Sequence, residues 1–185
     1  MIVYVMLADG FEEIEALTVV DLLRRADIDT ETVSIHNQLK ITGSHGVEVI
    51  ADILFEDAVF DNCEMIVLPG GGGGAKNLAA HDGLREKLYS FAKSGRRISA
   101  ICASPAVVLA PLGILKGKNA TCFPSFSEEM AGEIGTAITP GSVVKDENFI
   151  TSRGPAQAID FALAIIESLK GSEAAEEISK AILYK

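Results

Sequence analysis

The alternation of short apolar runs with helical patterns constrains the fold of this chain more than any other feature. Apolar runs of strand length are found at residues 2–7, 31–35, 65–68 and 97–101. Segments with helical spacing are found at residues 13–26, 81–93, 103–111 and 155–169, and a short helix follows. This alternation predicts an α/β fold, a doubly wound and mostly parallel sheet sandwiched by helices. A late hairpin is expected at residues 143–145 and 149–151, and an exposed β excursion at residues 46–51.

Length and charge limit the class of protein. The 185 residues are predicted to form a single domain, residues 1–185, because no linker or internal repeat interrupts them. No apolar run approaches the ~18 residues that cross a bilayer, and the first residues lack the basic region of a signal peptide. We therefore expect a cytoplasmic protein with no membrane partner. The formal net charge of −10 also argues against binding to nucleic acid, because such a field repels phosphate.

Neither the cysteines nor the glycines form a pattern that binds a cofactor. Cys63, Cys102 and Cys122 show no CxxC or Cys/His spacing, so neither a disulfide framework nor a metal site is expected. The glycines at residues 70–74 match almost any glycine template, and no GKS or GKT sequence follows them. We expect no cofactor. The run is better suited to an oxyanion-stabilising turn, in a loop at the carboxyl edge of the sheet.

Cys102 is the leading candidate for chemistry. It lies where the predicted strand 97–101 passes through small residues into the next helix, the layout of a nucleophile elbow. Backbone N–H groups and the positive end of a helix dipole at such a turn favour a thiolate. The alternative is a small buried cysteine that merely ends a strand. A partner side chain is needed to decide between the two.

Glu15 is the candidate partner. Glu15, Val19, Leu22 and Ala26 fall on one stripe of the predicted helix, and Glu15 is its only polar member. Such a carboxylate is either buried and protonated or placed at the mouth of the helix. If it is ionised it raises the pKa of a neighbouring thiol, whereas a protonated carboxyl donates a hydrogen bond to the thiolate and lowers that pKa. Burial raises the pKa of a glutamate and so supplies the protonated form.

Other polar residues have simpler interpretations. Glu12 and Glu13 begin the same helix, where acidic groups favour the helix dipole. His45 lies in a turn bracketed by glycines and is either solvated or placed over a pocket. Cys63 begins a strand and is expected to be structural, and Cys122 is a second candidate thiol near the Cys102 segment.

Several segments together resemble the ThiJ/PfpI family, in the branch of the Parkinson-disease protein deglycase and the bacterial YajL-like proteins. They are residues 9–15 (DGFEEIE), 67–71 (VLPGG), 74–78 (GAKNL), 100–103 (AICA) and 151–155 (TSRGP). The resemblance covers nearly the whole chain in family order. It implies a flavodoxin-like fold, similar to class I glutamine amidotransferases, and a homodimer. It also implies Cys102 as nucleophile and oxidation site, Glu15 as its protonated partner, and backbone N–H groups of Gly71 and Ala103 near the reacting oxygen.

The chain departs from the family pattern at the edge of the expected pocket, which Gly70, His45 and Phe123 are predicted to line. Phe123 stands where many members carry a histidine, so no histidine relay is assumed. His45 stands where those members carry an arginine. Ala103 follows the cysteine, whereas the protease-like branch has a histidine there, which argues against Cys-His peptidase chemistry.

Two functions follow as hypotheses. The first is cysteine-dependent, cofactor-independent deglycase or glyoxalase chemistry on small dicarbonyls such as methylglyoxal or on early glycation adducts, in stress defence. The alternative is a redox-sensing, chaperone-like stress protein that acts through oxidation of Cys102. A glutamine amidotransferase needs a histidine downstream of its cysteine, and no histidine follows Cys102.

Overall fold

The computed structural model describes residues 2–184 and confirms the predicted fold class. A seven-stranded sheet has the order β5-β2-β1-β6-β7-β9-β8, and only β8 runs antiparallel to its neighbour. Its strands are β1 (Ile2–Leu7), β2 (Asp29–Ser34), β5 (Ile53–Leu54), β6 (Cys63–Leu68), β7 (Arg97–Ile101), β8 (Val143–Asp146) and β9 (Phe149–Ser152). A separate hairpin pairs β3 (Lys40–Thr42) with β4 (Glu48–Ile50).

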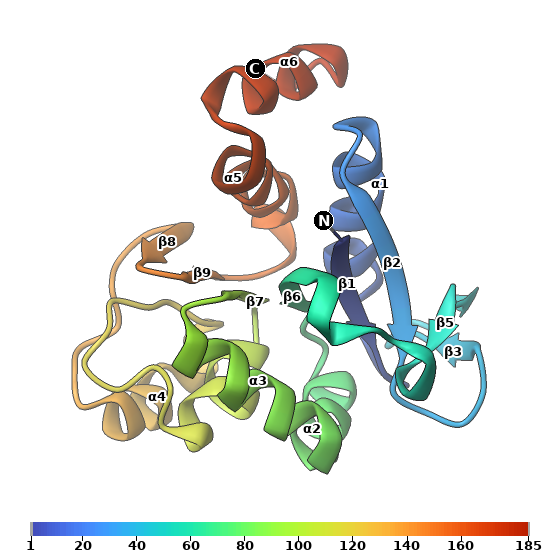
Figure 1. Ribbon diagram of the computed structural model, residues 1–185. Helices are drawn as coiled ribbons and strands as arrows, with labels where there is room; N and C mark the ends of the chain where they lie inside the picture. The colour runs from blue at the N-terminus through green and yellow to red at the C-terminus, as the bar shows by residue number, and fades with distance from the viewer. Residues whose placement is uncertain (1, 185) are drawn as a thin grey trace.

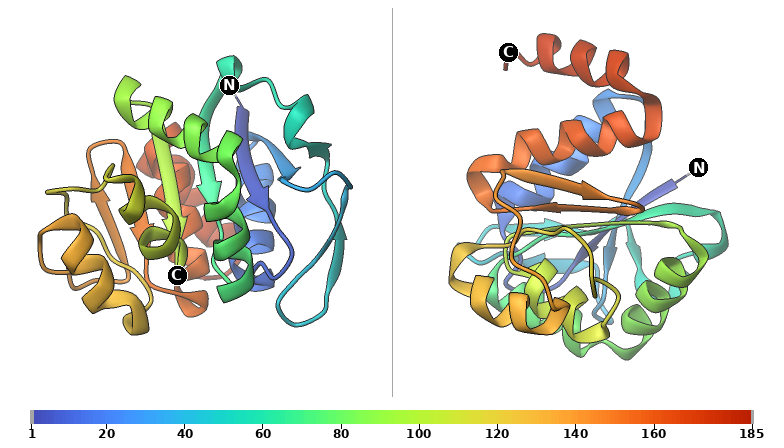
Figure 2. Two further views of the ribbon diagram at one scale, coloured as in Figure 1. Left: turned by 90° about the horizontal axis from the view of Figure 1, so that it is seen from below. Right: turned by 90° about the vertical axis from the view of Figure 1, so that its left-hand side faces the viewer.

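Helices cover both faces of the sheet (Figure 1, and edge-on in the right-hand view of Figure 2). One face carries α1 (Glu13–Arg25), α5 (Ala158–Lys170) and α6 (Ser172–Ala181). The other carries α2 (Gly72–Ala80), α3 (Asp82–Ser94) and α4 (Ser127–Ile134). None of the helices formed by residues 2–184 combines the length and the apolar character needed to cross a membrane.

Strand β1 explains the apolar run at the start of the chain. Val3, Val5 and Leu7 pack into the core beneath α1 and α5, whereas Tyr4 and Met6 pack into the core beneath α2 and α3. Because side chains alternate between the two faces of a strand, a strand covered on both faces must be apolar at nearly every position.

Three expectations about local structure were wrong or incomplete. The glycines at residues 72–74 were expected to form a turn, but they form the first turn of α2. Residues 103–111 were expected to begin an α-helix; instead a turn leads into a π-helix, Pro105–Leu109, and then a 3₁₀ helix, Ala110–Leu112. Pro111, inside the expected helix, lacks the N–H group that a regular helix needs at that position. Strand β3 and helix α4 had no counterpart in the sequence prediction.

Candidate active site

Cys102 lies at the carboxyl end of β7 in a left-handed conformation, with φ of +63°. A non-glycine residue in this region costs on the order of 1–2 kcal/mol. Two backbone hydrogen bonds hold the strained residue: its N–H donates to the Ser152 carbonyl (2.9 Å), and its carbonyl accepts from the Phe123 N–H (2.8 Å). The turn leaves the thiol half-buried, whereas Cys63 and Cys122 are buried.

Glu15 projects from the first turn of α1 and is completely buried. Its Oε2 accepts a 2.7 Å hydrogen bond from the Gly70 N–H. Oε1 is buried and has no hydrogen-bond partner among residues 2–184. Burial raises the pKa of Glu15 to about 7, and the Gly70 N–H and the Cys102 thiol oppose that rise. As the apolar stripe predicted, the carboxyl of Glu15 is buried, and it keeps its proton up to about neutral pH.

Gly70 brings the carboxyl and the thiol together. A Cβ atom at this position would lie 2.5 Å from Oε2 of Glu15, 2.6 Å from Cβ of Cys102 and 3.0 Å from its Sγ. Those approaches are shorter than non-bonded contacts allow, so any side chain here would push the two groups apart. Both groups therefore rest against the same point of the Gly70 backbone, which requires glycine.

Cys102 does not have the lowered pKa that the sequence suggested. Burial first, and then the charge of ionised Glu15 and its interaction with the thiol, raise the pKa of Cys102 to about 12. The backbone N–H groups of Gly71 and Ala103 lower the pKa of Cys102, as predicted, but burial and Glu15 raise it by more. A thiolate and a carboxylate so close together exclude one another, so the pair holds one proton over a wide pH range.

Gly71 lies where the loop after β6 packs closely against the loop after β1. Its φ is +87°, and a Cβ there would lie 2.2 Å from the Gly10 carbonyl oxygen. The Glu12 N–H donates to the Gly70 carbonyl (3.0 Å), and the Gly74 N–H donates to the Gly10 carbonyl (2.9 Å). The sequence resemblance associated the N–H groups of Gly71 and Ala103 with a reacting oxygen, and that role stays a prediction. In the structure both groups lower the pKa of the Cys102 thiol.

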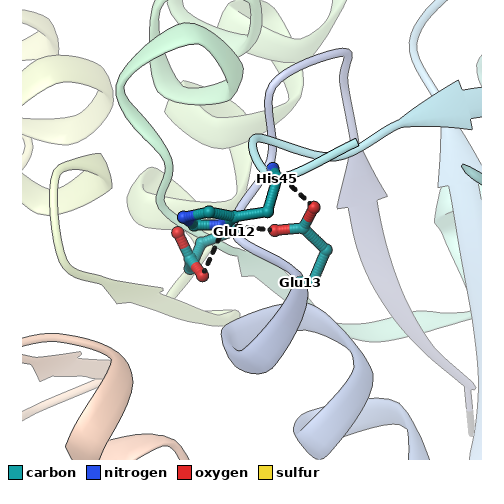
Figure 3. A group of neighbouring side chains, drawn as sticks. All are labelled: Glu12, Glu13 and His45. Atoms are coloured by element: carbon teal, nitrogen blue, oxygen red, sulfur yellow. Dashed lines mark hydrogen bonds and ion pairs between the residues drawn. The ribbon is translucent and has the colours of Figure 1, made fainter. Parts of the chain in front are cut away.

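His45 belongs to a cluster with Glu12 and Glu13 (Figure 3). Its ring is largely exposed, and Nδ1 lies 3.0 Å from Glu13 Oε2 and 3.5 Å from Glu12 Oε1. Glu13 is buried and accepts hydrogen bonds from the His45 N–H (2.7 Å) and the Ser44 hydroxyl (3.1 Å). Helix-start electrostatics had been the only role expected for Glu13. Its second role, as acceptor for the turn between β3 and β4, depends on a contact across more than thirty residues.

Phe123 lies beside the elbow through its backbone bond to Cys102, with a partly exposed ring. The ring packs against Gly154, where an added Cβ would lie 3.3 Å from Cδ2 of the ring. Cys122 points into the core, where burial raises its pKa and the Ser127 hydroxyl interacts with it. Burial likewise raises the pKa of Cys63, to about 11. Neither of these thiols has the exposure that a nucleophile needs.

A family model for DJ-1/PfpI proteins matches residues 1–168. The chain belongs to the DJ-1/PfpI family. The resemblance and the fold predicted from sequence are thereby confirmed. Among solved structures, the oxidized DJ-1 of Toxoplasma gondii superposes with a TM-score of 0.94 at 36% identity, covering 99% of this chain and 98% of that one.

Curated relatives include members of different length. Protein DJ-1 homolog B of Arabidopsis thaliana is 40% identical over 98% of this chain, and the chain spans only 41% of that protein. The glutathione-independent glyoxalase DJR-1.2 of Caenorhabditis elegans is 33% identical over 91% of this chain and 88% of its own length. The family thus includes a glyoxalase-type enzyme.

Proposed function

We propose that this protein is a cysteine-dependent, cofactor-independent glyoxalase and deglycase that removes reactive dicarbonyls in stress defence. The observation that carries the proposal is the juxtaposition, against the Gly70 backbone, of a buried carboxyl and a half-buried thiol. The carboxyl has a pKa of about 7, so it can accept and return a proton at the pH of the cell. The name of the C. elegans relative supports the same chemistry.

The proposed reaction converts methylglyoxal and water into lactate. The Cys102 sulfur bonds to the aldehyde carbon while its proton passes through Glu15 to the carbonyl oxygen, giving a hemithioacetal. Glu15 then takes the proton from that carbon, giving an enediolate, and returns it to the neighbouring carbon. The hydroxyl proton on the first carbon moves to the oxygen of the second, which leaves a thioester of lactic acid on Cys102. Water cleaves the thioester and restores the thiol. Gly71 and Ala103 supply N–H groups to the oxygen that becomes charged, and Gly70, His45 and Phe123 border the pocket.

The proposal extends to early glycation adducts, because they revert to the same carbonyls. It also includes a cytoplasmic homodimer, as the family resemblance implies. Ile14 and Leu17 support a surface for a second copy, since these large apolar side chains of α1 are exposed in the single chain. Light scattering combined with size-exclusion chromatography tests the dimer, and a monomer at micromolar concentration would overturn that part.

Steady-state kinetics with methylglyoxal test the activity. We expect lactate formation to disappear in Cys102→Ala and to persist in Cys122→Ala, the matched control in which a buried thiol is removed. A Cys102→Ala protein that retains most of its turnover would refute the proposal.

The redox-sensing function is retained as a second candidate because the backbone N–H groups of Gly71 and Ala103 favour negative charge on the Cys102 sulfur, lowering its pKa. Such donors would hold the oxygens of a sulfinate formed with peroxide. Mild peroxide should then add two oxygens to Cys102 selectively, as peptide mass spectrometry would show. Equal oxidation of Cys63 and Cys122 would count against it.

A further inference from the structure

Three metal-ligating side chains meet beside the candidate active site. Glu12 and Glu13 lie at the start of α1, and His45 reaches them from the turn between β3 and β4 (Figure 3). One ligand atom from each, two carboxylate oxygens and an imidazole nitrogen, lies within 4.8 Å of the others. The three side chains come from two segments, so the group is assembled by the tertiary fold.

The spacing of these atoms suits one ion. Ligands of a tetrahedral Zn²⁺ lie about 2.0–2.1 Å from the metal, and hence roughly 3.3 Å from one another. Nδ1 of His45 is 3.0 Å from Glu13 Oε2 and 3.5 Å from Glu12 Oε1. The Ser44 hydroxyl oxygen lies 3.0–3.1 Å from the imidazole nitrogen and from an oxygen of each carboxylate. This hydroxyl has one proton and faces three groups able to accept it.

Hydrogen bonds hold the Glu13 carboxylate in a position from which it can bind a metal ion. Its Oε1 accepts from the backbone N–H of His45, which leaves Oε2 facing the imidazole and the Ser44 hydroxyl. The backbone N–H groups of His45 and Val47 both donate to Oε1, at 2.7 and 3.4 Å, so the β3–β4 turn fixes the position of this carboxylate.

The charge and access of the cluster also favour a cation. Within residues 2–184, the ion pairs of Glu12 and Glu13 are made only with His45, so no lysine or arginine neutralises the two carboxylates. The His45 side chain is 71% exposed, whereas those of Glu12 and Glu13 are 13% and 10% exposed. One side of the cluster is thus open to solvent and to an entering ion.

We propose that Glu12, Glu13 and His45 form a binding site for one Zn²⁺ ion. One imidazole and two carboxylates are ordinary zinc ligands, and three protein ligands leave a fourth position for water. The site adjoins the candidate active site, because the Glu12 N–H donates to the carbonyl of Gly70. The inference does not depend on the proposed glyoxalase function.

Zinc titration of the Cys102→Ala protein tests the site without interference from the half-buried thiol. Isothermal titration calorimetry should show one Zn²⁺ per chain. Adding His45→Gln or Glu12→Gln should weaken binding at least about tenfold, since even partners that only orient a ligand contribute about 10–100-fold. Both substitutions keep the Glu13 carboxylate and the backbone N–H groups that it binds.

His36→Gln in the same background is the matched control. The imidazole of His36 lies 3.8 Å from one carboxylate, that of Asp9. Replacing it with glutamine is therefore expected to leave zinc binding unchanged. Circular dichroism of each variant separates loss of ligand from loss of fold. Absence of saturable binding, unchanged binding in a correctly folded His45→Gln protein, or an equal loss in His36→Gln would each overturn the proposal.

Discussion

Gly70→Ala should separate the thiol from the carboxyl with the addition of a single methyl group. The new Cβ would lie 2.5 Å from Glu15 Oε2 and 2.6 Å from Cys102 Cβ, so at least one of the two side chains must move. The φ of Gly70 is not positive, so alanine brings no backbone strain and the effect is steric. Overpacking of this kind costs about 1–3 kcal/mol, partly offset by ~0.4–1 kcal/mol because alanine restricts the unfolded chain.

The expected effect on catalysis is larger than that on folding. If the carboxylate is pushed off the Gly70 N–H, a hydrogen bond to a charged group is lost, worth about 1.5–3 kcal/mol. A loss of that size in the transition state lowers kcat/KM for methylglyoxal by roughly 10–150-fold. Urea denaturation and steady-state kinetics on the same preparation measure the two effects.

Gly72→Ala is the matched control two residues away. A Cβ at Gly72 meets nothing within 4 Å, and the residue lies in the first turn of α2. Alanine there should leave activity unchanged and stabilise the protein by up to about 1 kcal/mol. Wild-type kcat/KM in Gly70→Ala, or an equal loss in both variants, would refute the account of how Gly70 places the two groups.

Three further predictions concern single side chains. Glu15→Gln should lower the pKa of Cys102, because the carboxylate charge is gone, and yet reduce turnover sharply, because an amide cannot carry the proton; the pH profile of iodoacetamide alkylation and the kinetics together check this. Burial raises the pKa of Cys63 to about 11, so the folded protein disfavours the thiolate. The stabilisation from the neutral thiol is fully present below about pH 9 and is lost as the pH rises through 11. In urea denaturation the wild type should therefore lose roughly 2–3 kcal/mol over that window relative to Cys63→Ala. Glu13→Gln should speed amide hydrogen exchange in the 43–47 turn, and unchanged exchange there would show that Glu13 does not hold the turn.

The sequence predicted the candidate site best where residues close together in the chain determine the local structure. Cys102 was identified from the small residues around it, and it occupies the strained elbow those residues allow. Glu15 was identified because it interrupts an apolar stripe, and the helix buries it as that stripe requires. In both cases the evidence lay within a few residues of the chain.

Features that depend on distant contacts were missed. Helix α2 begins among glycines with poor helix propensity, because its first turn packs against the loop of residues 8–13. A Cβ on Gly74 would lie 2.7 Å from Cα of Phe11, so close backbone approach requires glycine there. The raised pKa of Cys102 was missed for a similar reason, because the burial of the thiol depends on distant segments and Glu15 was expected to be protonated.

The most direct test of the central claim is to look for the covalent intermediate. A single turnover of methylglyoxal, quenched in acid and followed by peptide mass spectrometry, should reveal a lactoyl thioester on Cys102. The account predicts this adduct on Cys102 and not on Cys63 or Cys122, with its formation slowed in Glu15→Gln. Lactate formed at the wild-type rate with no adduct on Cys102 would contradict the claim that this thiol is the nucleophile.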